Sequence, residues 1–170
     1  MAFDIKKNLS LIATVVIIFT IAIGGYYLIN LGKGRYAAAD FVALNYKWGV
    51  GDTLVNSYDS ATGDYQYLDN RDSLIKTNVK LRANNIIFLH SKANELDLWQ
   101  LPNVIANKNA DLKNDKVLRY EITFVYEKEA KNIIYLVDYN ENLTIAFAAN
   151  ELQKMIKKTI DEAEERYSKP

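Results

Sequence analysis

The chain has 170 residues, of which 49% are hydrophobic and 25% charged, and it contains two prolines and no cysteine. This composition excludes a disordered protein, a disulfide-stapled scaffold and any site built on cysteine. Beyond residue 33 the chain keeps 18 basic and 20 acidic residues, a balance without the basic excess of a nucleic-acid-binding module. The sequence therefore predicts one domain with an N-terminal appendage.

The first predicted element is an uncharged helix over Leu9–Leu31. At about 1.5 Å per residue it would extend roughly 34 Å, enough for a hydrocarbon core of about 30 Å. We expect a transmembrane helix behind a short cytoplasmic head, residues 1–8. The residues that mark the predicted span along its length are Leu9, Ile12, Val16, Phe19, Ile23, Tyr27 and Leu31.

The flanks of this helix favour a single-pass signal anchor. Two lysines precede it, and Lys33 and Arg35 follow it, so the basic residues alone do not orient it. The small head and the folded mass behind the helix favour an inner-membrane protein with an extracytoplasmic, periplasmic domain over 36–170. One alternative is a cleaved signal peptide, because residues 37–39 fit an A-x-A cleavage pattern. A buried core helix is disfavoured, because the helix lacks a polar stripe.

Four strands are expected next, from alternating hydrophobicity and from the turn residues between them. The predicted strands are 36–48, 52–58, 64–69 and 73–81. In the first of them, Val42, Leu44 and Trp48 are predicted to share one face with Tyr46. The loop 59–63 ends in Gly, which indicates a hairpin between the second and third strands.

From about residue 85 onward, apolar residues recur at the spacing of a helix. Asn84 is a plausible cap for a helix that begins near Asn85 and ends before Pro102. A polar surface loop, 103–116, follows it.

The remaining elements are a hairpin and a final helix. The hairpin pairs 117–126 with 132–139, and an amphipathic helix over 149–170 closes the chain. The order of these elements predicts an α+β fold in which antiparallel hairpins form a sheet and two helices pack on one face.

No catalytic, metal-binding or cofactor-binding residue is predicted. His90 is the single histidine, and without Cys or a second His it does not make a usual zinc site. The acidic residues over 59–72 lack the spacing of a calcium loop, and no G-x-S-x-G motif is present. Asn142, Leu143 and Thr144 match the glycosylation sequon, a triplet that is common by chance. We expect a protein that is not an enzyme.

Twelve tyrosines are the one unusual feature of the composition. Most alternate along strands and should pack inside the sheet, while others are predicted to form a recognition face, since Tyr is enriched at interfaces. The candidate interaction residues are Tyr120, Tyr126, Tyr135 and Tyr139.

One stretch resembles a known pattern. Residues 73–102 form a predicted strand and helix that end in Glu95-Leu96-Asp97-Leu98-Trp99-Gln100-Leu101-Pro102. With the tyrosine-rich hairpin and the final helix, this ending resembles a group of small secreted or membrane-anchored bacterial domains of unknown function. Their motif is similar to E-L-G-F-[FW]-x-L-P, and Asp97 stands at its Gly. The resemblance implies a compact α+β fold outside the cytoplasm and brings no catalytic residue.

The predicted function is that of a non-enzymatic, membrane-anchored accessory or assembly subunit of a bacterial inner-membrane complex. Its expected partners are the lipid bilayer and either an integral membrane protein or a second copy of the chain, with no nucleic acid and no cofactor. The alternative is a periplasmic binding module for a small ligand or peptide, using a tyrosine-lined sheet face or an exposed strand edge. A hydrolase using Asp and Glu ranks last.

Overall fold

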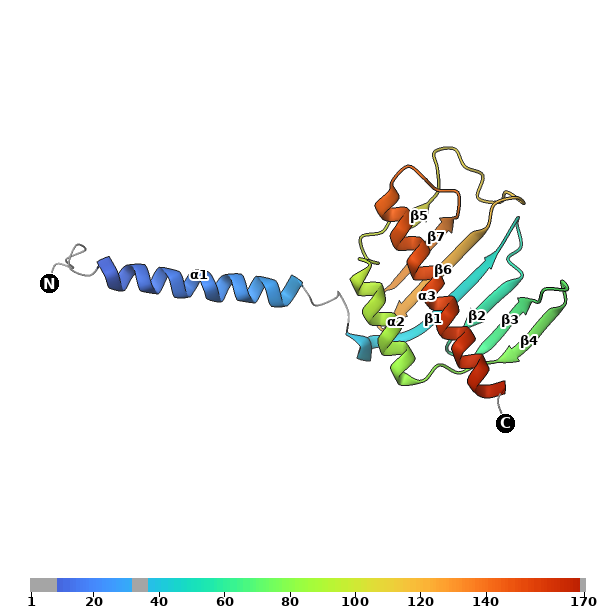
Figure 1. Cartoon of the computed structure of the whole chain (residues 1–170), viewed down its shortest axis with the longest axis horizontal. Coiled ribbons are helices and arrows are strands. Elements are labelled where there is room, and N and C mark those ends of the chain that lie inside the picture. The colour runs from blue at the N-terminus through green and yellow to red at the C-terminus, as the bar shows by residue number, and fades with distance from the viewer. Residues whose placement is uncertain (1–8, 32–36, 169–170) are drawn as a thin grey trace. The chain divides into compact units, whose positions relative to one another are not determined.

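The computed structural model describes residues 9–31 and 37–168 of the chain. The chain divides into two compact units, Met1–Gly34 and Arg35–Pro170 (Figure 1). The described part of the first unit is one helix, α1 (Leu9–Leu31). The second unit combines a sheet with two long helices and is α+β, as predicted.

The helix α1 forms where it was predicted, but the transmembrane span assigned to it is wrong. Within residues 9–31 and 37–168, no helix has both the length and the apolar character needed to cross a membrane. The finding also overturns the signal anchor, the single-pass topology and the inner-membrane location with a periplasmic domain.

Three of the residues that marked the predicted span have described side chains. Val16, Phe19 and Ile23 are all exposed, and no described side chain of α1 belongs to the buried core. The side chains of Leu9, Ile12, Tyr27 and Leu31 lie outside the described residues, as does the predicted head, residues 1–8.

The second unit is built on a seven-stranded sheet with the strand order β4-β3-β2-β1-β6-β7-β5. The strands are β1 (Phe41–Gly49), β2 (Asn56–Asp59), β3 (Asp64–Leu68), β4 (Leu74–Asn78), β5 (Val104–Ile105), β6 (Arg119–Tyr126) and β7 (Ala130–Leu136). Neighbours are antiparallel except for β5 and β7, which run parallel. The sheet is therefore mixed, because a short segment predicted as loop joins its edge as β5.

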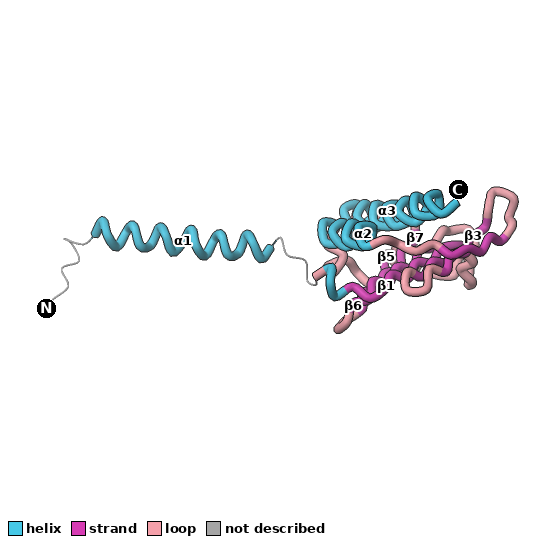
Figure 2. Tube along the Cα trace, turned by 90° about the horizontal axis from the view of Figure 1, so that it is seen from below, coloured by secondary structure: helices cyan, strands magenta, loops and turns pink. Residues whose placement is uncertain are grey.

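Two helices of this unit cover one face of the sheet, and neither of them lies on the other face (Figure 2). They are α2 (Ala83–Glu95) and α3 (Leu143–Ser168). Large side chains from both layers are fully buried between them, among them Tyr46, Tyr58, Phe124, Leu89, Leu152 and Ile156. We call the two sides of the sheet the helix-covered face and the helix-free face.

A bulge at the start of β1 changes which residues reach the core. The register with β6 shifts between Phe41 and Ala43, so one extra residue enters the strand there. Val42, predicted to share a face with Leu44, is 53% exposed, whereas Leu44 is fully buried. The predicted alternation is correct from Leu44 onward and wrong before the bulge.

The end of α2 explains the position at which the chain departs from the motif it resembles. The amide of Leu98 donates to the carbonyl of Ala93 (2.9 Å), and the amide of Asp97 donates to that of Asn94 (3.0 Å). This pair of bonds is a Schellman motif, which needs a left-handed residue after the helix. Asp97 takes that role with φ 56°, a conformation that glycine adopts without strain.

The final helix begins earlier than its hydrophobic stripe predicts. The side-chain oxygen of Asn142 accepts hydrogen bonds from the amides of Thr144 (3.0 Å) and Ile145 (3.2 Å). Asn142 is therefore the N-cap of α3. The helix starts at Leu143, and the triplet that matches a sequon is a helix start.

Candidate binding face

The tyrosines predicted as a recognition face lie in or against the core. Tyr120, Tyr126 and Tyr135 are buried, and Tyr139 packs against the core from its rim. The ring of Tyr120 stacks between those of Tyr46 and Tyr135, with centroid separations of 6.0 and 6.2 Å. These rings fill the space between the sheet and the helices, so they contribute packing there.

The single histidine is also part of this packing. His90, on α2, is buried, and its Nδ1 lies 2.6 Å from the hydroxyl of Tyr126. Its Nε2 lies 2.9 Å from the side-chain nitrogen of Asn94. Burial raises the pKa of Tyr126 to about 12. Both ring nitrogens thus make polar contacts inside the fold, and the contact of Nδ1 with Tyr126 joins α2 to β6.

Two further tyrosines hold α3 to the far half of the sheet. The hydroxyl of Tyr65 donates to Asp161 (3.2 Å) and that of Tyr67 donates to Glu164 (3.1 Å). Burial, reinforced by these carboxylates, raises the pKa of both phenols. The polar groups of the helix-covered face are therefore used to attach the helices.

The helix-free face carries a hollow of about 470 Å³ over β1, β2, β3, β6 and β7. Its side chains alternate along the strands with the core residues, as the two-residue period of a strand requires. The lining residues are Asn45, Lys47, Ser57, Tyr58, Asp59, Asp64, Glu121, Thr123 and Asn132. All carry a charge, an amide or a hydroxyl, and only the hydroxyl of Tyr58 is used inside the fold, where it donates to the carbonyl of Val79 (3.0 Å), so the hollow offers hydrogen bonds from every side.

The charges of the hollow are unbalanced toward the negative. Among the lining residues, three carboxylates, those of Asp59, Asp64 and Glu121, stand against the single ammonium of Lys47, and Glu121 is also paired with the buried Arg119. Two of the carboxylates are oriented by short local bonds: Asp59 accepts from the amide of Ala61 (2.8 Å) and Asp64 from the hydroxyl of Thr62 (2.8 Å). Within residues 9–31 and 37–168, the ammonium of Lys47 makes no hydrogen bond or ion pair. Both signs of charge therefore remain available to a ligand.

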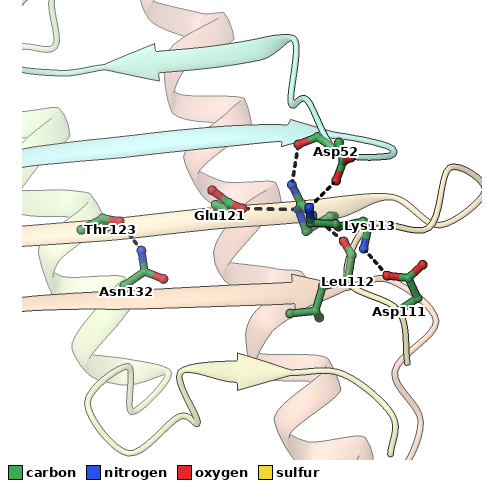
Figure 3. Close-up of polar contacts among 8 residues, drawn as sticks. Asp52, Asp111, Leu112, Lys113, Glu121, Thr123 and Asn132 are labelled. Carbon is green, nitrogen blue, oxygen red and sulfur yellow. Dashed lines mark hydrogen bonds and ion pairs between the residues drawn. The ribbon is translucent and has the colours of Figure 1, made fainter. Parts of the chain in front are cut away.

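The third carboxylate is held by a buried arginine. The Nε of Arg119 lies 3.3 Å from Glu121, and its other nitrogens donate to the carbonyls of Leu112 and Asp52. An ion pair of Lys113 with Asp52 (2.9 Å) closes the same cluster. Figure 3 shows these side chains gathered where the long loop before β6 meets the loop after β1. The rim of the hollow is thus fixed by contacts between two loops.

A hydrogen bond between neighbouring strands fixes the other side of the hollow. The side-chain nitrogen of Asn132 on β7 donates to the hydroxyl of Thr123 on β6 at 2.9 Å (Figure 3). This bond orients the amide of Asn132 and leaves its oxygen as an acceptor. The floor of the hollow therefore presents polar atoms whose positions are set before any ligand arrives.

Sequence reasoning did not identify this face. The alternation that predicted core residues implies polar residues between them, but it does not say that strands distant in the chain become neighbours. In the part of the chain that the structure describes, no group of three or more His, Cys, Asp or Glu side chains is placed to hold a metal ion. The chain matches no protein-family model and no curated protein.

Proposed function

We propose that the folded unit is a non-enzymatic accessory subunit that binds a basic segment of another protein on its helix-free face. The observation that carries this proposal is the polar, net acidic hollow on the face of the sheet opposite to α2 and α3. A basic, extended segment matches its charge, and backbone amides and carbonyls of such a segment match its amides and hydroxyls.

The composition of the hollow supports a polypeptide over a small apolar ligand. Pockets for small molecules are mostly apolar with a few polar groups, and here the proportion is reversed. The tyrosines that would have lined an aromatic site, Tyr120, Tyr126 and Tyr135, are buried in the core. These two observations disfavour the small-ligand alternative.

The expected affinity follows from the number of carboxylates. An exposed ion pair contributes up to about 1 kcal/mol, so recognition requires that Asp59, Asp64 and Glu121 act together. Neutralising all three should weaken binding by about tenfold or more. Binding should also weaken as the salt concentration rises, because exposed charges are screened.

The test is a titration of the full chain, labelled with ¹⁵N, with a lysine-rich peptide and a glutamate-rich peptide of equal length. The lysine-rich peptide should shift the amide signals of Asn45, Thr123 and Asn132, and the glutamate-rich peptide should not. The variant Asp59→Asn, Asp64→Asn, Glu121→Gln should lose the response, because each substitution removes a charge and keeps an acceptor oxygen.

A matched control changes the same number of charges on the helices. The variant Glu95→Gln, Glu151→Gln, Glu162→Gln should bind the lysine-rich peptide as the unmodified chain does. Equal loss in both triple variants would show that overall charge, and not the hollow, governs binding. That outcome, or equal binding of both peptides, would contradict the proposal.

A further inference from the structure

One edge of the sheet offers backbone groups to a partner. β4 (Leu74–Asn78) stands last in the strand order and pairs only with β3. At the opposite edge, β5 spans two residues, Val104–Ile105. A strand at an edge presents unpaired N–H and C=O groups, to which another extended chain can add.

The register shows which residues of β4 present those groups. The amide of Val79 donates to the carbonyl of Gly63 (2.7 Å), and the amide of Asp69 donates to that of Ser73 (3.0 Å). Direct bonds of this kind mark hydrogen-bonded pairs, which alternate along an antiparallel ladder. Ile75 and Thr77 therefore turn their backbone groups toward β3.

The residues between them turn the other way. Leu74, Lys76 and Asn78 direct their N–H and C=O groups away from β3, into the open edge. Their side chains stand on the helix-free face, where Leu74 pairs with Leu68 and Lys76 pairs with Gln66. The edge thus combines free backbone groups with an apolar position, a basic position and an amide.

A second copy of the chain fits this edge poorly. Two β4 strands in the antiparallel register that overlaps all three outward residues would place Lys76 opposite Lys76. Like charges directly opposite each other destabilise a strand pair, and a lysine on an edge strand is a common device against self-pairing. Lys76 is exposed and makes no ion pair within residues 9–31 and 37–168.

We propose that β4 binds an extended segment of another protein by antiparallel strand addition, with a carboxylate of that segment opposite Lys76. Read along the partner, the residue opposite Asn78 is polar, the one opposite Lys76 is acidic, and the one opposite Leu74 is apolar. The exposed pair of Leu68 and Leu74 covers the apolar residue. Asp64, which lines the hollow, is paired with Asn78, so this edge adjoins the hollow, but it takes a partner segment of opposite charge.

The test uses the full chain and two acetylated peptides of about nine residues. One has the core order Thr-Thr-Glu-Thr-Val, and the other has Lys in place of Glu. Hydrogen–deuterium exchange should slow at the amides of Leu74, Lys76 and Asn78 with the Glu peptide, and much less with the Lys peptide. Lys76→Glu should reverse this preference, with at least about a fivefold change in affinity for each peptide.

Two further variants separate backbone pairing from charge. Lys76→Pro removes an outward-facing N–H together with the ammonium, and proline is tolerated on an edge strand, so it should abolish binding of both peptides while the fold persists. Lys76→Gln should weaken the Glu peptide and keep the edge protection. The variant Asp59→Asn, Glu121→Gln, which leaves Asp64 opposite Asn78 unchanged, should bind the Glu peptide normally, which separates this proposal from the function proposed above.

Three outcomes would overturn strand addition at β4. The first is unchanged exchange at Leu74 and Asn78 in the presence of the Glu peptide. The second is a preference that Lys76→Glu does not reverse. The third is protection of the same amides that grows with protein concentration in the absence of peptide, since that would identify a second copy of the chain as the occupant.

Discussion

The two faces of the sheet are made by neighbouring residues of the same strands and differ in almost every property. On β6, Ile122 and Phe124 are fully buried on the helix-covered face, while Thr123 between them lines the polar hollow. The aromatic rows pack beneath the helices, and the hydroxyls of Tyr65 and Tyr67 bond α3, whereas the charges on the opposite side belong to the proposed binding face. Two residues that are one position apart on a strand therefore lie on different faces, one in the core and the other on the proposed binding face.

The largest effect is expected from alkaline pH, which should unfold the protein by ionising the phenols of the helix-covered face. Burial raises the pKa of seven phenols on the helix-covered face: Tyr46, Tyr58, Tyr65, Tyr67, Tyr120, Tyr126 and Tyr135. Above an ordinary pKa of about 10 the unfolded chain releases protons that the folded chain keeps, so stability falls as pH rises. For Tyr126 this loss extends to about pH 12.

Phenolate absorbance and far-ultraviolet circular dichroism measured against pH check this prediction. A cooperative rise in absorbance should coincide with the loss of helical signal. Complete ionisation near pH 10 with the circular dichroism intact would show that these rings are accessible, and it would remove the distinction between the faces.

Truncation of a core ring is the next largest effect. Phe124→Ala should cost about 3–5 kcal/mol in the free energy of unfolding, because it leaves a cavity beneath the helices. Thr123→Ala, one position away, removes a methyl group and a hydroxyl from the open face and should cost under about 1 kcal/mol. Urea unfolding monitored by tryptophan fluorescence measures both, and equal losses would contradict the assignment of faces.

The bond between His90 and Tyr126 is a polar exception inside the covered face. Tyr126→Phe keeps the ring and leaves a buried imidazole nitrogen without this partner, which should cost about 1–3 kcal/mol. Tyr167→Phe is the control, since that hydroxyl bonds the carbonyl of Lys80 at an exposed position. It should change stability by less than about 0.5 kcal/mol, and urea unfolding compares the two variants.

The covering layer also depends on how its helices begin. Asn142→Ala removes the cap of α3 and should cost about 1 kcal/mol, whereas Asn142→Asp keeps the acceptor oxygen and adds a favourable charge at a helix N-terminus. Thermal unfolding should place the alanine variant lowest. No difference between alanine and aspartate would show that α3 is held by packing alone.

The smallest effect concerns the end of α2. Asp97→Gly should stabilise the fold by about 0.5–1 kcal/mol, because it relieves the left-handed strain of Asp97 and only partly loses this to chain entropy. Asp97→Ala, which lacks the local hydrogen bonds of Asp in this conformation, should destabilise it. A higher melting temperature for glycine and a lower one for alanine would confirm the reason for glycine at this position in the motif.

The sequence predicted what depends on local pattern. The hairpin of β6 and β7 and the amphipathic final helix were both predicted, because their signals repeat within one element. Asn142, which caps α3, carried a local signal for a helix start as well.

Other features were out of reach because they depend on distant residues. The parallel pairing of β5 involves two residues, too few for a periodic signal, and the bulge at Val42 needs the opposing strand β6. The hollow brings Asp59 near Glu121 only because β1 pairs with both β2 and β6. No pattern within one element specifies that strand order.

The central place of β1 also has a consequence for the rate of folding. Its pairing with β6 joins Gly49 to Arg119, which closes a loop of about 70 residues, whereas the strand pairs on either side are hairpins with short loops. Closing a long loop costs chain entropy before it gains contacts, so this step should limit folding to milliseconds or slower. The β1–β2 and β6–β7 hairpins are expected to form first. The pairing of β1 with β6 then joins them into one sheet.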